Sequence, residues 1–459
     1  MEIRALIEKY KNEIVEKTQE IIRIRSVEGT PAEGKPFGEG PYKALEYAVN
    51  LSKEMGFKVE EFDGYAAHAE IGQGDELVGI LVHLDVVPEG EGWEYDPYGG
   101  EVHDGKIYGR GAVDDKGPAI AVMYAMKILQ DLGVDFNRRI RIIFGTNEES
   151  GWGCMNHYLS KVKPPTMAFT PDADFPVING EKGIMVFDLR YPLKEDGEVK
   201  LIDLKGGSAP NMVPDTASVT LELEDIDSLM ERAKSYNGED KIEINVEGKT
   251  IQIRAKGKSA HGSTPERGEN AISNLMAFLG EVLKAGSLKE FARLYNESIG
   301  FYHNGEGIGC GFEDEISGKL NFNAGMIKYE DGYITLTINI RYPITSSAKE
   351  VYAGMREKLK DTDMVIVEGS DQKPLYVPED NFLVTKLMDV YRSVTGDYDS
   401  KPIVIGGGTY ARAMENAVAF GPVFPGQEDV VHQKNEYIAI DHLMMLTEIY
   451  TKALYELSR

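Results

Sequence analysis

The sequence predicts an α/β protein in which a doubly wound mixed sheet, with helices on both faces, is interrupted by an inserted α+β domain with an antiparallel sheet. Three observations lead to this prediction. Strand-like and helix-like patterns alternate over residues 1–180, apolar and polar residues alternate over residues 181–372, and the first pattern returns over residues 373–459. Because 459 residues are too many for one compact core, we expect residues 1–180 and 373–459 to form one domain and residues 181–372 to form a second.

The spacing of apolar residues predicts the elements of the first domain in chain order. Residues 1–24 have apolar positions at helical intervals and charged residues throughout, which predicts an amphipathic opening helix. Leu77–Leu84 is a continuous apolar run, typical of a strand that is buried on both faces. We expect a helix with a broad apolar face at Gly117–Leu132 and short strands at Arg139–Gly145 and Thr166–Thr170.

The middle of the chain has the period of half-buried strands. Apolar and polar residues alternate in the segments MVFDLRY, SVTLELE, KIEINV, TIQIRAK and YITLTINIRY, as in antiparallel strands with one solvated face. We expect helices between these strands, near Asp225–Lys234, Asn270–Lys284 and Ser347–Lys360. These elements are enough for two small α+β units side by side.

The last part of the chain returns to the first domain. Its spacing predicts helices at Asn381–Val394 and Asp441–Leu457 and a strand at Pro402–Ile405 that leads into three consecutive glycines.

Composition restricts the partners and the compartment. The 76 acidic and 50 basic residues give a net charge of −26, which disfavours binding to nucleic acid and to anionic membranes. The two cysteines, Cys154 and Cys310, are too few for a disulfide-stabilised secreted domain. The charged N-terminal segment does not resemble a signal peptide, and no apolar run reaches the length of a membrane span. We therefore expect a cytoplasmic protein.

Polar clusters follow the predicted strands of the first domain, where ligands of open α/β sheets bind. His83 and Asp85 end the first apolar strand and lie two residues apart, so that their side chains face the same way. Asp114 and Asp115 precede the Gly117–Leu132 helix. Taken alone, the first pair could be a chance polar pair and the second a helix cap.

Two further clusters and a distant histidine complete a candidate metal site. Glu148 and Glu149 follow one strand and Asp172 follows another, and adjacent carboxylates repel each other unless a cation or solvent lies between them. Imidazole and carboxylate groups are suitable ligands for zinc, manganese or cobalt. A second histidine that would make a pair of sites symmetrical is present far downstream, as His432. The other histidines are expected to be structural: His68, His103, His157, His303 and His442.

Six motifs occur in an order that resembles a known superfamily. They are HLDVVPEGEGW, YGRGAVDDKGP, GTNEESG, TPDAD, KSAHGSTPERGENAI and DVVHQKNEYI. In this order they resemble the motifs of the di-metal aminoacylase and carboxypeptidase superfamily, and most of all those of bacterial dipeptidases of the peptidase V type. The resemblance covers nearly the whole chain, whereas any single motif would be weak.

The resemblance implies two divalent metal ions as cofactors, with zinc expected first and manganese or cobalt as alternatives, and a ligand set shared between them. It implies that Asp114 bridges the two ions. His83 and Asp172 complete one metal site, and Glu149 and His432 complete the other.

The resemblance also implies roles in catalysis and in substrate binding. Glu148 matches the general base, Asp85 matches the residue that orients His83, and the peptide bond between Asp114 and Asp115 is expected to be cis. His261 matches an oxyanion donor from the inserted domain. The residues expected to hold the substrate are Asn211, Arg341, Gly407 and Gly408.

Three functions are compatible with these motifs: a dipeptidase, an N-acyl amino acid deacylase such as a succinyl-diaminopimelate desuccinylase, and a non-catalytic binding protein. The presence of Glu148 disfavours the binding protein, which has no use for a general base. The resemblance favours a dipeptidase that acts on short peptides with a free amino terminus. Members of the superfamily that cleave such peptides tend to have Asp at the position of Asp172, and the inserted domain of about 190 residues is larger than that of the dimeric deacylases. In members of the superfamily with a small inserted domain, two subunits pair through this domain and one supplies a histidine to the other. The larger insertion of this chain could replace the partner's domain, so the resemblance implies a monomer.

Overall fold

The computed structural model describes residues 2–194 and 199–459, and these residues form two compact units. The first unit contains the two ends of the chain, with residues 1–179, 377–403 and 409–459. The second contains residues 180–376 and the short segment 404–408. The glycine turn that follows the strand β21 (Ile403–Ile405) therefore groups with the second unit.

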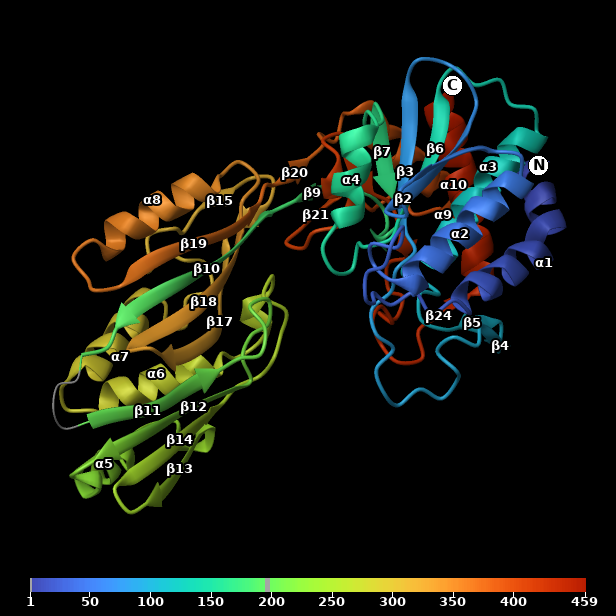
Figure 1. The fold of residues 1–459 in the computed structure, drawn as a ribbon. Coiled ribbons are helices and arrows are strands. Elements are labelled where there is room, and N and C mark those ends of the chain that lie inside the picture. Colours follow the sequence, from blue (N-terminus) through green and yellow to red (C-terminus); the bar gives the residue numbers. More distant parts are fainter. Residues whose placement is uncertain (1, 195–198) are drawn as a thin grey trace. The chain divides into compact units, whose positions relative to one another are not determined.

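A mixed sheet forms the centre of the first unit (Figure 1). Its strands lie in the order β1-β2-β6-β3-β7-β22, and β9 follows β22. The strands β6, β3, β7 and β22 are parallel to one another, whereas β1 and β2 are antiparallel to their neighbours. The bounds of these strands are β1 (Lys58–Phe62), β2 (Ala66–Ile71), β3 (Leu77–His83), β6 (Arg139–Gly145), β7 (Met167–Thr170), β9 (Ile178–Glu181) and β22 (Ala417–Ala419).

Helices cover both faces of this sheet. On one face, α3 and α10 contact β3 and β6 and pack against α1, while α2 contacts β1 and β2. On the other face, Tyr158 of α4 contacts His68 and Arg141 of the sheet. The helices of this unit are α1 (Glu2–Ile22), α2 (Glu39–Glu54), α3 (Lys116–Asp131), α4 (Gly153–Lys161), α9 (Phe382–Thr395) and α10 (Ile440–Ser458). This arrangement confirms the predicted fold class.

The second unit is built on one eight-stranded antiparallel sheet in the order β13-β14-β12-β11-β17-β18-β10-β19. Its strands are β10 (Gly183–Pro192), β11 (Val199–Gly206), β12 (Thr216–Leu223), β13 (Ile242–Glu247), β14 (Thr250–Lys256), β17 (Asn321–Glu330), β18 (Tyr333–Tyr342) and β19 (Val365–Gln372). Every second residue of β10 is buried, as the alternating pattern predicts. The core of this unit also includes α5 (Ile226–Ala233), α6 (Ala271–Val282), α7 (Ser287–Ser298) and α8 (Ala348–Leu359).

The eight strands form a single sheet rather than two separate ones, but its two halves are joined narrowly. The central strands β11 and β17 pair at only two positions, Lys205 with Lys328 and Gly206 with Ile327. Four strands lie on each side of this junction.

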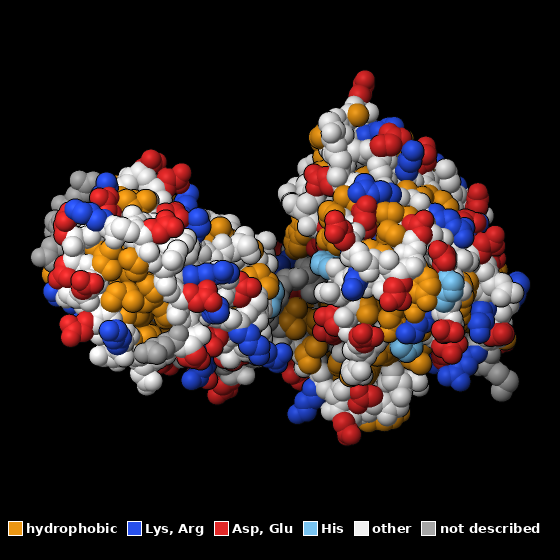
Figure 2. Space-filling view, turned by 90° about the horizontal axis from the view of Figure 1, so that it is seen from below, with side chains coloured by type: hydrophobic (Ala, Val, Ile, Leu, Met, Phe, Trp, Pro, Cys, Tyr) orange, Lys and Arg blue, Asp and Glu red, His pale blue; other side chains and the backbone are white. Residues whose placement is uncertain are grey.

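The remaining strands are short. They are β4 (Glu101–His103), β5 (Lys106–Tyr108), β8 (Ala173–Asp174), β15 (Glu313–Asp314), β16 (Gly318–Lys319), β20 (Leu375–Tyr376), β23 (Pro422–Val423) and β24 (Tyr437–Ala439). On the face shown in Figure 2, Lys and Arg side chains are interspersed with Asp and Glu side chains. Within residues 2–194 and 199–459, no helix has the length and apolar character required to span a bilayer.

Candidate metal centre

The candidate metal ligands come from the carboxyl ends of neighbouring strands in the first unit. The strands β3, β6 and β7 are parallel, so that their carboxyl ends lie at the same edge of the sheet. His83 is the last residue of β3, Glu149 follows β6, and Asp172 follows β7. Asp114 lies in the loop before α3. Strand ends of this kind are the usual ligand sites of open α/β sheets.

Asp114 lies between two histidines. Its Oδ1 is 2.9 Å from His83 Nε2, and its Oδ2 is 3.0 Å from His432 Nε2. Each histidine has a second carboxylate nearby, since Asp172 Oδ1 is 3.7 Å from His83 Nε2 and Glu149 Oε2 is 3.2 Å from His432 Nε2. The five residues thus form two groups that share the carboxylate of Asp114. The peptide bond between Asp114 and Asp115 is cis, as the resemblance implies.

Asp85 has contacts that the sequence does not predict. The Nδ1 atom of His83 is 3.0 Å from the backbone carbonyl oxygen of Asp85 and 3.6 Å from its carboxylate. The carboxylate instead accepts hydrogen bonds from the backbone N–H groups of Glu148, at 3.0 Å, and Glu149, at 3.1 Å. Asp85 therefore orients the imidazole through its carbonyl group and holds the loop of the two glutamates through its side chain.

Two carboxylic acids of the site have raised pKa values. Burial, followed by the charge of Asp172, raises the pKa of Glu148 to about 8. Burial and the charge of Asp114 raise the pKa of Asp172 to about 7. Hydrogen bonds to Asp114 and Glu149 raise the pKa of His432 to about 10. The crowding of buried carboxyl groups therefore disfavours the ionised forms of Glu148 and Asp172.

This crowding of carboxyl groups fits a site for divalent cations. The cluster offers only imidazole nitrogen and carboxylate oxygen atoms, which zinc, manganese and cobalt all accept as ligands. The sets His83, Asp114, Glu149 and His83, Glu148, Asp172 are each close enough to hold an ion. A positive charge between these groups would favour the ionised carboxylates that burial disfavours.

Glu436 and Arg110 support the site and were not predicted as functional residues. Glu436 is fully buried, and its carboxylate accepts a hydrogen bond from Arg110 Nη1 at 2.8 Å. It also accepts the backbone N–H groups of Gly111, Val113 and Asp114, at 3.1, 3.0 and 3.3 Å. Glu436 belongs to the same sequence motif as His432. Its supporting role is indicated by its burial, and burial is a property of the fold rather than of the motif.

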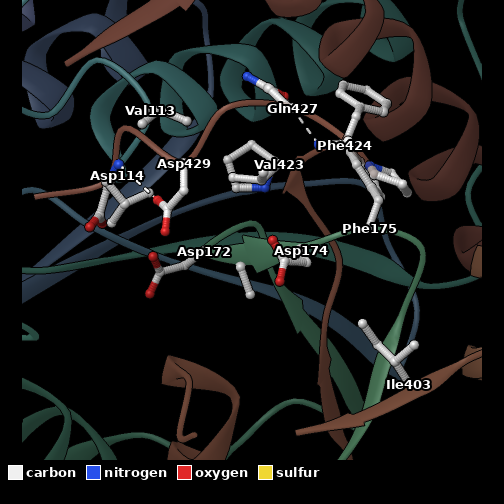
Figure 3. A pocket seen from close by; sticks show the side chains of 15 residues that line it. Val113, Asp114, Asp172, Asp174, Phe175, Ile403, Val423, Phe424, Gln427 and Asp429 are labelled. Carbon is white, nitrogen blue, oxygen red and sulfur yellow. Dashed lines mark hydrogen bonds between the residues drawn. The ribbon is translucent and has the colours of Figure 1, made fainter. Parts of the chain in front are cut away.

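A pocket of about 550 Å³ opens beside the cluster within the first unit. In Figure 3, Asp114 and Asp172 lie on the left of the pocket, and the side chains of Phe175 and Phe424 lie on the right. Ile403 adds to the apolar lining. A small molecule bound here would contact both the acidic cluster and an apolar wall.

The other predicted site residues belong to the second unit, where three of them are neighbours. The backbone N–H of Gly262 donates to the carbonyl oxygen of Asn211 at 2.7 Å, next to His261. Burial and the positive charge of Arg341 lower the pKa of His261. The predicted Gly407 and Gly408 are also part of this unit, in the segment 404–408. The roles of these residues in substrate binding stay predictions.

Known proteins are similar to this chain in sequence and in fold. The model of "Peptidase family M20/M25/M40" matches residues 79–456. The chain is 40% identical over 458 residues to "Putative dipeptidase YtjP" from Bacillus subtilis (strain 168), with 98% of each chain covered. Its fold is similar to that of human carnosine dipeptidase 1, with a TM-score of 0.58, 18% identity and coverage of 99% and 98%. It is also similar to the aminoacylhistidine dipeptidase of Vibrio alginolyticus, with a TM-score of 0.59, 15% identity and coverage of 97% and 96%.

Proposed function

The chain belongs to peptidase family M20/M25/M40, and we propose that it is a dipeptidase that cleaves short peptides with a free amino terminus. The observation that carries this proposal is the position of Asp114, whose two carboxylate oxygens each face one histidine. A shared carboxylate of this kind would bridge two divalent cations. His83 and Asp172 would complete one site, and Glu149 and His432 the other.

Glu148 is the proposed general base. Divalent cations bound by these ligands would polarise the peptide carbonyl group and make a water molecule more acidic. Glu148 would accept the proton of that water and deliver it to the nitrogen of the leaving amine. Asp85 supports this role because its carboxylate fixes the backbone N–H of Glu148.

The proposed substrate has two charged ends. The acidic cluster around Asp172 would attract the free ammonium group, and the guanidinium group of Arg341 suits a terminal carboxylate. Within the second unit, His261 is proposed to stabilise the oxyanion, and Asn211 to bind the peptide backbone. Gly407 and Gly408 lack side chains and would allow a close approach of the substrate.

The names of the relatives support peptide cleavage. "Putative dipeptidase YtjP" covers almost the whole chain, and several staphylococcal relatives bear the same description at 36–37% identity. We further propose that the enzyme acts as a cytoplasmic monomer with zinc, manganese or cobalt. Both cysteines are free and buried, which is in keeping with a reducing compartment.

The decisive experiment combines metal analysis with a panel of substrates. Purified protein should contain two divalent ions per chain, and its activity should be lost on chelation and restored by zinc, manganese or cobalt. Dipeptides should be cleaved far faster than the same dipeptides with an acetylated amino end or an amidated carboxyl end. Faster cleavage of an N-succinyl diamino acid than of any dipeptide would instead identify a deacylase.

A further inference from the structure

Trp152 makes a direct contact with the proposed general base. Its indole Nε1–H donates a hydrogen bond to Glu148 Oε1 at 3.1 Å. The two residues are four positions apart on the loop between β6 and α4. Trp152 is not among the predicted site residues.

The backbone conformation at Trp152 is unusual for a large side chain. Trp152 has φ 60° and ψ 19°, in the left-handed region, and it lies directly before α4. Large side chains are uncommon in this conformation, which glycine adopts at little cost, and glycines occupy both adjacent positions. A tryptophan at this left-handed position therefore has a backbone cost that glycine would not have.

The loop and a neighbouring ring hold the indole in place. The backbone N–H of Trp152 donates to the carbonyl oxygen of Asn147 at 2.7 Å, and Asn147 Oδ1 accepts the N–H of Gly153 at 2.9 Å. The ring of Tyr410 packs edge-on against the indole, with 5.8 Å between the ring centroids. Tyr410 is fully buried and also lies edge-on to His83, at 6.2 Å. The donor that faces Glu148 is thus fixed against the framework of the site.

We propose that Trp152 is a positioning residue for Glu148, whose indole N–H fixes the orientation of the catalytic carboxylate. This inference rests on the proposed function, since it concerns the base of that reaction. A carboxylate that accepts a fixed hydrogen bond on one oxygen loses its freedom to rotate, and its other oxygen is then presented in a constant direction. Reaction rates depend steeply on this kind of orientation, whereas substrate affinity does not.

The contact can be tested without measuring activity. The chain contains only two tryptophans, Trp93 and Trp152, so protein labelled with ¹⁵N in the indole ring gives two N–H resonances. Trp152→Phe assigns them. Glu148→Ala should shift the Trp152 resonance and leave that of Trp93 unchanged, because Trp93 donates to the backbone carbonyl of Glu89 instead. An unchanged Trp152 resonance in Glu148→Ala would refute the inference and leave the proposed function intact.

The kinetic test separates the donor from the shape of the ring. Replacing Trp152 with benzothienylalanine keeps the shape of the indole and substitutes sulfur for N–H, and Trp152→Phe removes the donor with less volume. Both should lower kcat by about 10- to 100-fold, the value of a hydrogen bond to a charged group. KM and metal content should stay at the level of the unmodified enzyme.

The control variant is His157→Gln, which removes an aromatic ring from the neighbouring helix α4. His157 is stacked on Tyr65 and bonded to Asp63, and it does not contact Glu148. We expect its kcat to be unchanged. A benzothienylalanine enzyme with a kcat within twofold of normal would contradict the positioning role, and so would a loss explained entirely by lower metal content.

Discussion

Glu148 is the residue on which the proposed chemistry depends. Glu148→Gln preserves the size of the side chain and removes its ability to accept a proton. Turnover of a dipeptide should fall by about 100- to 10,000-fold, while both metal ions and the affinity for substrate are retained. Steady-state kinetics and metal analysis would measure these quantities. Glu415→Gln, at an exposed position of the same unit, serves as the control, and normal turnover in Glu148→Gln would remove this residue from the mechanism.

His68 should make stability depend on pH. Its side chain is 5% exposed, and burial, followed by the charge of Arg141, lowers its pKa to about 4. Its Nδ1 lies 3.0 Å from the hydroxyl oxygen of Tyr158, and the carboxylate of Glu60 lies 3.7 Å from its Nε2. The unfolded chain therefore binds a proton more readily than the folded protein does. This contribution to stability is complete above pH 6.5 and is lost as the pH falls toward 4.

The variant His68→Gln should remove this dependence. Between pH 6.5 and pH 4 the free energy of unfolding of the unmodified protein should decrease by up to about 3 kcal/mol more than that of the variant. Urea unfolding at a series of pH values would measure the difference. Parallel pH profiles for the two proteins would show that His68 takes up its proton equally well in the folded state.

At the level of elements, the loop before α3 depends on Glu436. This one carboxylate accepts three backbone N–H groups of the loop and the guanidinium group of Arg110. Glu436→Ala would leave Arg110 buried without its charge partner, so that the free energy of unfolding should fall by about 3–5 kcal/mol. Metal content should fall as well, because the loop carries Asp114. The control is Glu428→Ala, at an exposed position of the same segment. Equal stability and metal content in the two variants would contradict this role.

Capping side chains mark four of the helix starts that the sequence predicts. Four helices whose starts were predicted begin after a residue whose side chain accepts a backbone N–H: Asp225, Asn270, Ser347 and Asn381. Three helices that were not predicted begin after residues that make no such bond: Gly38, Trp152 and Gly286. The helices α3 and α10 also lack a side-chain cap, yet their starts were predicted to within one residue from apolar spacing. A cap is therefore one local signal of a helix start, and strong apolar spacing is another.

Some strands have a local signal in the sequence and others do not. The isoleucine-rich segment Arg139–Gly145 is β6 with the predicted bounds. The strand β2 was not predicted, because its sequence AAHAEI consists largely of small residues and includes a histidine and a glutamate, yet all six residues are buried. Its polar side chains are paired within the fold, since Glu70 binds Arg141 and His68 contacts Tyr158. Such pairing depends on partners that are distant in the sequence.

At the level of the whole molecule, the expectation of a monomer leads to a complementation test. Glu148→Gln and His261→Ala should each be inactive, and they affect different units of the chain. If each chain supplies its own His261, a mixture of the two variants should stay inactive. Activity measured after mixing, together with the mass in solution by light scattering, decides the matter. Recovered activity would demonstrate that a histidine from one chain serves the metal centre of another.

The sequence by itself determined the family and the set of residues that we propose to carry the chemistry. His83, Glu149 and Asp172 follow apolar strands, and the order of six motifs indicated the family and the distant His432. Each of these features can be recognised from consecutive residues, because a predicted strand ends where its apolar residues end.

Only the tertiary structure decided how these residues are arranged. It places one oxygen of Asp114 beside each histidine, directs the carboxylate of Asp85 to the loop of Glu148, and buries Glu436 beneath Asp114. Hydrogen-bond partners are set by side-chain torsions and by segments more than 300 residues apart, as for Asp114 and Glu436. The order of residues along the chain shows neither the torsions nor the distant partners, because it is the same whether a carboxylate is buried or exposed.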